Sequence, residues 1–135
     1  MESSLNLLAE LQDRFNLEID GIIFKHVKNG RQAFDLDGEI IDSPTAFISL
    51  QAFGKDSTTD NGEILQLMRT VAITIISNSN DTDLSDYVDL ILENIQEEPY
   101  LTERTSIEFD SATAMFNNEK DYFTINLNLI SNLEV

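Results

Sequence analysis

Two runs of apolar residues recur three or four positions apart, which is the spacing of one face of an α-helix. The first run consists of Leu5, Leu8, Leu11 and Phe15. Ser3 or Ser4 can cap its first turn by accepting an N–H hydrogen bond, so a helix is predicted over about residues 4–15. The second run consists of Leu84, Tyr87, Val88, Ile91, Leu92 and Ile95. It follows the polar segment 80–83 and ends before Pro99, which predicts a helix over about residues 82–97.

Between residues 17 and 42 the pattern is that of short strands and tight turns. Asn29-Gly30 lies between two apolar runs, and Asp37-Gly38 follows soon after. These dipeptides favour hairpin turns because both turn residues adopt a positive φ there. We therefore expect three short strands or bent segments in this part of the chain.

Two longer β patterns follow. Residues 45–53 alternate, which predicts a strand with Leu50 and Ala52 on one face and Phe53 on the other. The segment 54–62 contains no apolar side chain and is predicted to be a mobile, solvated loop. Residues 64–77 are apolar on both faces, interrupted by Arg69, which predicts a central strand or one covered by a neighbouring subunit.

The C-terminal part of the chain continues with β patterns. Strands are predicted over about 105–109, 112–116 and 121–130, with a turn at Asn117-Asn118. Two helices and about six strands predict an α+β fold, in which two main helices pack on one face of a largely antiparallel (mixed) sheet. The length of 135 residues and the absence of a linker or repeat predict a single domain over 1–135.

Composition adds a strong charge imbalance. The chain has 25 Asp and Glu against 8 Lys and Arg, a formal net charge of −17. This argues against binding to the phosphates of nucleic acids or to anionic membranes, both of which need clustered cations. No apolar run approaches the ~20 residues of a membrane helix, so no contact with a membrane is expected.

The charges are also unevenly distributed along the chain. No cation lies between Arg69 and Arg104, whereas eight acids lie there. Either these residues form solvated faces, or a basic hairpin arm meets an acidic helix of an identical neighbour. The residues expected in that contact between subunits are Lys25, Lys28, Arg31, Arg69, Asp86, Asp89 and Glu93.

Candidate chemistry is sparse. There is no cysteine, and the one histidine, His26, has no nucleophile or metal ligand near it in sequence. The segment 35–39 resembles part of a calcium loop, but its twelfth position is Ala46 rather than glutamate. The segment from Asp81 to Leu92 fails the same test at its sixth and twelfth positions, and a helix cap explains its acids better. No catalytic, cofactor or metal residues are therefore predicted.

The order of these elements resembles the tail terminator (tail completion) proteins of long-tailed bacteriophages. The resemblance covers most of the chain and lies in length, order and pattern rather than in a catalytic signature. It is carried by the helix 4–15, the Asp42-Ser43-Pro44 entry into a strand, the polar loop 54–62, the strand 68–77, the helix after Asn80-Asp81-Thr82-Asp83, and the final strand 122–130.

The resemblance implies a structural protein of the virion, present in the host cytoplasm during assembly. It implies a hexameric ring of identical subunits that caps the tail tube, docks to the head–tail connector and lets DNA pass through a sheet-lined channel. An anionic lining would suit that passage, because like charges do not adhere. The expected contact with the tail-tube or connector protein is the loop containing Lys55, Asp56, Ser57, Thr58, Thr59 and Asp60.

Two other classes of function stay open. The net charge and the acidic stretch favour an acidic inhibitor of a nuclease or restriction enzyme that imitates DNA. A small hydrolase or isomerase that uses a carboxylate pair is disfavoured, because no such pair lies in an apolar context that would raise a pKa.

Overall fold

The computed structural model describes residues 2–28, 41, 43–58, 62, 64–78, 83–117 and 120–133. The elements in chain order are α1 (Ser4–Glu18), β1 (Ile23–His26), β2 (Thr45–Thr58), β3 (Ile64–Asn78), α3 (Leu84–Glu97), β4 (Thr105–Asn117) and β5 (Lys120–Asn132). The strands form one sheet in the order β1-β2-β3-β5-β4. β1 pairs with β2 in parallel, and the other three neighbouring pairs are antiparallel. The predicted α+β fold with a largely antiparallel sheet is therefore confirmed.

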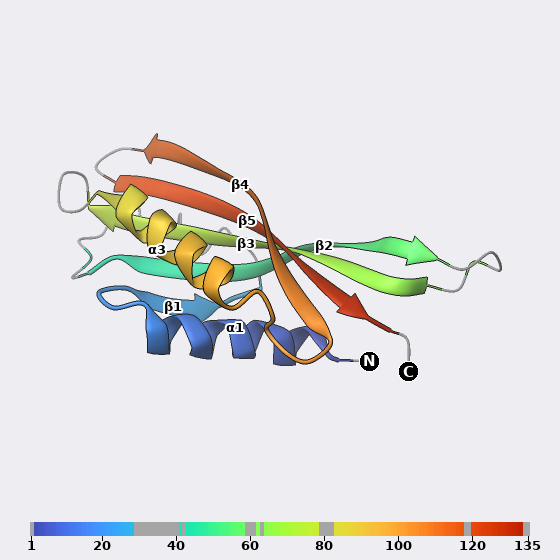
Figure 1. Cartoon of the computed structure of the whole chain (residues 1–135). Coiled ribbons are helices and arrows are strands. Elements are labelled where there is room, and N and C mark those ends of the chain that lie inside the picture. The colour runs from blue at the N-terminus through green and yellow to red at the C-terminus, as the bar shows by residue number, and fades with distance from the viewer. Residues whose placement is uncertain are drawn as a thin grey trace.

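Both helices lie on the same face of the sheet (Figure 1). Their buried side chains meet the apolar side chains of the sheet in one core, to which α1 contributes Leu7, Leu11 and Phe15. The facing residues of β3 are Val71, Ile73 and Ile75. On the other face, Ile76 packs with Phe47 and Tyr122 in a second, smaller cluster. β3 is thus central and apolar on both faces, as predicted.

Capping residues set the starts of both helices. The Ser3 side chain accepts a hydrogen bond from the N–H of Asn6 at 3.1 Å. The Asp83 carboxylate accepts from the N–H of Ser85 at 3.0 Å and from its hydroxyl at 2.6 Å. These bonds satisfy helix donors that otherwise lack partners, and they lower the pKa of Asp83 because they favour its ionised form. The predicted helix caps are confirmed.

The two helices are joined to each other by Arg14 of α1. Its guanidinium donates to the side-chain and backbone oxygens of Asn94 at 2.9 Å each, and to the backbone oxygens of Glu98 and Tyr100. These carbonyls belong to the end of α3 and the segment after it, and the last turn of α3 has no basic residue of its own. Arg14 therefore supplies the positive charge that a helix C-terminus favours.

The prediction of a loop over 54–62 is wrong for its first half. β2 continues to Thr58, and its partners on β3 include Lys55 with Leu67 and Ser57 with Gln66. Backbone hydrogen bonds between β2 and β3 hold this segment, so it needs no apolar side chain. In Figure 1 β2 and β3 extend beyond the helices as an arm, along which β5 stays paired with β3 as far as Gln66. The turns expected at Asn29-Gly30 and Asp37-Gly38 lie outside the described residues.

Two β-bulges changed which side chains share a face. A register shift between Leu50 and Ala52 places Phe53 opposite Arg69, on the helix-covered face with Leu50. The expectation that Leu50 and Ala52 share a face is therefore wrong, because one extra residue reverses the alternation. A second shift, between Phe109 and Ser111, makes β4 one bulged strand where two strands, 105–109 and 112–116, were expected.

Gly21 and Gly62 provide a matched test of how closely α3 approaches the turn before β1. Both have a φ of +84°. A Cβ added at Gly21 would lie 2.9 Å from the Tyr87 hydroxyl, which donates a hydrogen bond to the Gly21 carbonyl. A Cβ at Gly62 would have no atom within 4 Å.

We expect Gly62→Ala to lower the free energy of unfolding by about 1 kcal/mol, the cost of a left-handed backbone. Gly21→Ala should lower it by about 0.5–1.5 kcal/mol more, because the Tyr87 hydroxyl must move and its hydrogen bond to the Gly21 carbonyl is lost. Urea denaturation followed by circular dichroism measures both. An equal decrease in the free energy of unfolding for the two variants would show that the contact between Tyr87 and Gly21 does not contribute to stability.

Candidate functional site

The most buried charge in the structure is the guanidinium of Arg69 on β3, whose side chain is 1% exposed. It donates to the Ser4 hydroxyl at 2.9 Å, to the Ser131 hydroxyl at 3.0 Å and to the backbone oxygen of Glu2 at 2.8 Å. Burial lowers the pKa of Arg69, and the negative charge of Glu2 partly opposes this. Arg69 is therefore an interior residue, and its expected place in a contact between subunits is wrong.

The same residues form a connected polar cluster, here called the Arg69 cluster: Glu2, Ser4, Arg69, Thr105 and Ser131. The Glu2 carboxylate accepts a hydrogen bond from the Thr105 hydroxyl at 2.6 Å. The hydroxyl oxygens of Thr105 and Ser131 are hydrogen bonded to each other at 2.7 Å. The cluster fastens the segment before α1 to β3, β4 and β5. Its donors and acceptors are matched to one another, which indicates a structural role rather than one in binding a ligand.

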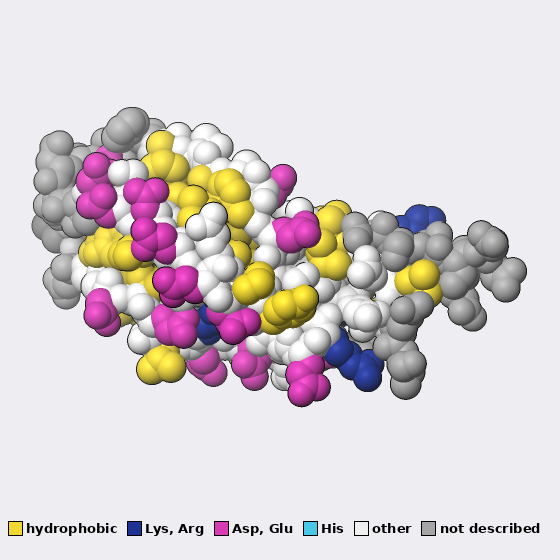
Figure 2. Space-filling view, in the orientation of Figure 1, with side chains coloured by type: hydrophobic (Ala, Val, Ile, Leu, Met, Phe, Trp, Pro, Cys, Tyr) yellow, Lys and Arg dark blue, Asp and Glu magenta, His cyan; other side chains and the backbone are white. Residues whose placement is uncertain are grey.

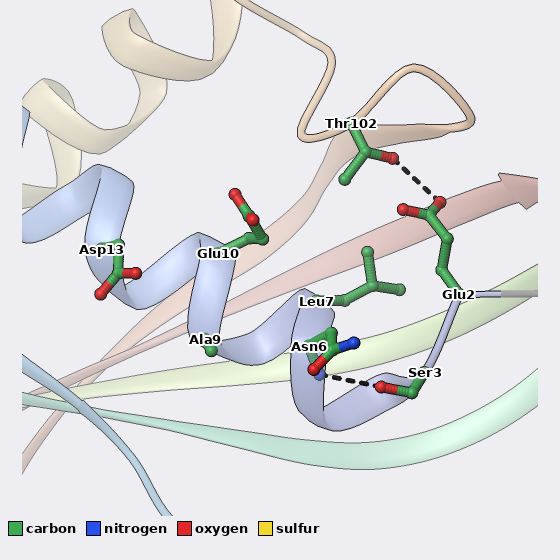
Figure 3. A pocket seen from close by; sticks show the side chains of 8 residues that line it. All are labelled: Glu2, Ser3, Asn6, Leu7, Ala9, Glu10, Asp13 and Thr102. Carbon is green, nitrogen blue, oxygen red and sulfur yellow. Dashed lines mark hydrogen bonds between the residues drawn. The ribbon is translucent and has the colours of Figure 1, made fainter.

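A groove of about 440 Å³ lies beside this cluster, between the start of α1 and the segment that carries Thr102 (Figure 3). Its lining residues are Glu2, Ser3, Asn6, Leu7, Ala9, Glu10, Asp13 and Thr102. The Thr102 hydroxyl donates a hydrogen bond to the Glu2 carboxylate at 2.9 Å, and the Ser3 side chain caps α1. Glu10 and Asp13 are exposed on α1. The polar groups at the mouth of this groove thus have local partners or face solvent.

The predicted acidic surface is present on the helices. Figure 2 shows acidic side chains over the elements that cover the sheet. The exposed members, here called the acidic helical surface, are Glu10, Asp13 and Glu18 on α1 and Asp86, Asp89, Glu93 and Glu97 on α3. On this surface Glu18 forms an ion pair with Arg14, at 3.5 Å. The remaining acids of this surface therefore stay uncompensated within the described part of the chain.

The other residues expected at a contact between subunits are on the surface. Lys25 lies on the edge strand β1 and Lys28 directly after it, and both are exposed. Asp86, Asp89 and Glu93 are exposed on α3, which packs against β4 and β5 near the opposite edge. Within the described parts of the chain, no ion pair joins the two groups. Arg31 lies outside the described residues.

The residues expected to contact a tail-tube or connector protein lie on the arm formed by β2 and β3 or beyond it. The backbone of Lys55, Asp56, Ser57 and Thr58 is part of β2, and Lys55 is exposed. Thr59 and Asp60 lie outside the described residues. Two apolar side chains in this region, Phe53 and Ile64, are 59% and 43% accessible, and the Phe53 ring lies 5.7 Å from the Arg69 guanidinium.

No metal-ligating group stands out in the parts of the chain that the structure describes. They contain no cluster of three or more His, Cys, Asp or Glu placed to hold a metal ion. His26 is exposed on β1, and its backbone N–H donates to the Gln12 side chain. No described helix is long and apolar enough to cross a bilayer.

Sequence reasoning missed the roles of Arg14 and Arg69. A signal for Arg69 was present, because a lone arginine in the apolar face of a central strand must be buried with partners. Arg14 gave no comparable signal, since its carbonyl partners are more than 70 positions away. Compared with protein-family models and with curated proteins, the chain matches none.

The Arg69 cluster can be tested with Arg69→Met. We expect it to lower the free energy of unfolding by about 3 kcal/mol, because it leaves buried hydroxyl and carbonyl groups without their partner. The matched control is Arg104→Met, which removes an exposed arginine and should change stability by less than about 0.5 kcal/mol. Chemical denaturation measures both, and equal values for the two variants would contradict a stabilising role for the cluster.

Proposed function

We propose that this chain is a structural assembly protein of a bacteriophage tail, a tail terminator that caps the tail tube as a ring of identical subunits. Support comes from the α+β architecture and from the element order noted in the sequence. The observation that carries the proposal is that exposed lysines and the acids of α3 lie at opposite edges of the sheet. Lys25 and Lys28 lie at the β1 edge, and the acids of α3 lie near the β4 edge.

This separation suits head-to-tail contacts between copies. A heterologous contact joins two different surfaces, and a ring closes when the rotation between neighbours is suitable. Lys25 and Lys28 of one subunit would meet Asp86, Asp89 and Glu93 of the next. Such complementarity steers association and fixes its register more than it adds affinity. Six subunits, a tail-tube protein on one side and a head–tail connector on the other complete the proposed assembly.

The sheet face without helices bears on the proposed DNA channel. Along β4 and β5 it carries mainly hydroxyl and amide groups, and some of these side chains are hydrogen bonded to their neighbours, such as Thr70 of β3 to Asn128 and Asn126 to Ser111. An acidic side chain on this part of the face is that of Glu108, which lies opposite Asn128 of β5. An anionic lining is therefore not found on this face. A channel lined by it would still offer DNA few cationic anchors, so DNA would pass without specific binding.

The acidic helical surface favours a second candidate, an acidic protein that imitates DNA and inhibits a nuclease or restriction enzyme. Its carboxylates are exposed and mostly uncompensated. Such an inhibitor would bind its enzyme more weakly as salt rises, because the contact is electrostatic. Salt-sensitive binding to a nuclease or restriction enzyme, together with a monomeric mass, would favour this candidate over the ring.

The ring is tested by measuring mass in solution with light scattering and by negative-stain imaging, with and without the tail-tube protein of the same genome. We expect rings of the wild type in the presence of the tail-tube protein. The double variant Lys25→Glu/Lys28→Glu should weaken assembly by about tenfold, the effect of losing charge pairs worth about 0.5–1 kcal/mol each. Adding Asp86→Lys/Asp89→Lys to it should restore assembly.

Lys55→Glu is the matched control, because it changes an exposed lysine away from β1 and α3. It should leave ring formation between identical subunits unchanged. A wild-type chain that stays monomeric even with the tail-tube protein present would contradict the proposal.

A further inference from the structure

The two edge strands of the sheet, β1 and β4, differ in how far their outer backbone groups are hydrogen bonded. At the β1 edge, the side-chain oxygen of Asn16 accepts from the Phe24 N–H at 2.7 Å, and its amide nitrogen donates to the Phe24 carbonyl at 2.9 Å. The Gln12 side chain accepts from the His26 N–H at 3.3 Å. These are the bonds that a neighbouring strand would make. Side chains of α1 therefore close this edge to further pairing.

The β4 edge is closed only at its beginning. The Leu101 N–H donates to the Thr105 carbonyl at 2.8 Å, and the Ile107 N–H donates to the Pro99 carbonyl at 2.7 Å. From Glu108 onward, no described residue is hydrogen bonded to the outer edge of β4. An unpaired strand edge of this length is a template for another strand.

The side chains along this free edge favour an uncharged partner strand. The segment 111–116 contains no charged residue, although the chain as a whole carries −17. Phe109 and Met115 are each 43% exposed, on opposite faces of the sheet, so a paired strand would shield apolar surface on both faces. The usual protections of an edge, proline and lysine, are absent from this segment.

We propose that the outer edge of β4, from Glu108 to Asn117, pairs antiparallel with β4 of a second copy of this chain around a two-fold axis. Because β1 is closed by Asn16 and Gln12, a β4–β1 contact cannot continue the sheet through both edge strands. Pairing of β4 with itself continues it and places the uncharged segment 111–116 against its own copy.

Repulsion between the acids Glu108 and Asp110 of the two copies limits the register of this pairing. With Thr113 on the axis, Ala112 lies opposite Ala114 of the partner subunit. Asp110 then lies opposite Phe116 of the partner subunit. At 3.3 Å per residue, the two Asp110 carboxylates are about 20 Å apart along the strands, beyond the ~10 Å over which charges interact at 0.1 M salt. Registers centred closer to Glu108 and Asp110 would bring like charges together.

This contact is distinct from the ring neighbours of the proposed function. It is isologous and closes at two copies, and it uses residues of β4 rather than Lys25, Lys28 or the acids of α3. It therefore concerns the state of the free chain, and either proposal can fail without the other.

The test is the dimerisation constant of the full chain, measured by sedimentation equilibrium. We expect a dimer that becomes tighter as salt rises, because salt screens the repulsion between two acidic copies. Thr113→Asp places two carboxylates across the axis, about 5 Å apart, and should weaken the dimer by about tenfold. Thr113→Asn has nearly the same shape without the charge and should leave it unchanged.

A mixture of Thr113→Asp and Thr113→Lys chains supplies the complementary measurement. It should form heterodimers more readily than either variant forms homodimers, since opposite charges then meet across the axis. Urea midpoints equal to that of the wild type would show that the variants are folded. A monomeric wild type at all salt concentrations, or equal dimerisation of Thr113→Asp and Thr113→Asn, would overturn the proposal. Binding of an extended peptide to β4 by a wild type that does not dimerise would overturn it in favour of another partner.

The control for independence is the double variant Lys25→Glu/Lys28→Glu. It should dimerise through β4 like the wild type while failing to form rings. Thr113→Asp should show the reverse, with weak dimers and unchanged rings. Loss of both assemblies in either variant would contradict the separation of the two contacts.

Discussion

Arg14 determines how one face of the sheet is covered. The sheet is wide, and the two helices that cover it are short, so each packs mainly on strands rather than on the other helix. Arg14 bridges them, because its guanidinium lies where the last carbonyls of α3 lack partners. Glu18, one turn further along α1, contacts both Arg14 and the Asn94 amide. The hydrogen bonds and ion pair of Arg14 therefore hold the two helices together at the edge of the core that they cover.

Three of the cations in the described part of the chain serve its interior, which leaves fewer positive charges on the surface. Arg14 and Arg69 are engaged within the fold, and Lys120 is 3% exposed. The exposed cations among the described residues are Lys25, Lys28, Lys55 and Arg104. The surface is consequently more acidic than the composition suggests. The proposed contacts between copies use the lysines near the β1 edge, which would meet acids, and the uncharged segment of β4.

Patterns that arise from burial were predictable from the sequence, and patterns that arise from backbone pairing were not. The apolar stripes predicted α1, α3 and the two-faced strand β3, because side-chain burial produces those periodicities. The extension of β2 to Thr58 and the bulges at Gln51 and Asp110 left no such trace, since they are properties of the hydrogen-bond ladder. For the site, the acids of α3 lie on its exposed face as predicted. The apolar neighbours of Arg69 in the sequence signalled its burial, but they could not identify its distant partners Glu2 and Ser131.

The Arg69 cluster has a consequence for how the chain folds as it is synthesised. Glu2 and Thr105 are 103 positions apart, and Arg69 and Ser131 are 62 apart. The guanidinium therefore emerges from the ribosome long before the strands that complete its shell. A nascent chain without β4 and β5 would have to keep Arg69 hydrated, which opposes burial of the face that α1 covers. Closure of the core is thus delayed until the last strands arrive, and folding is expected to be a late, all-or-none event.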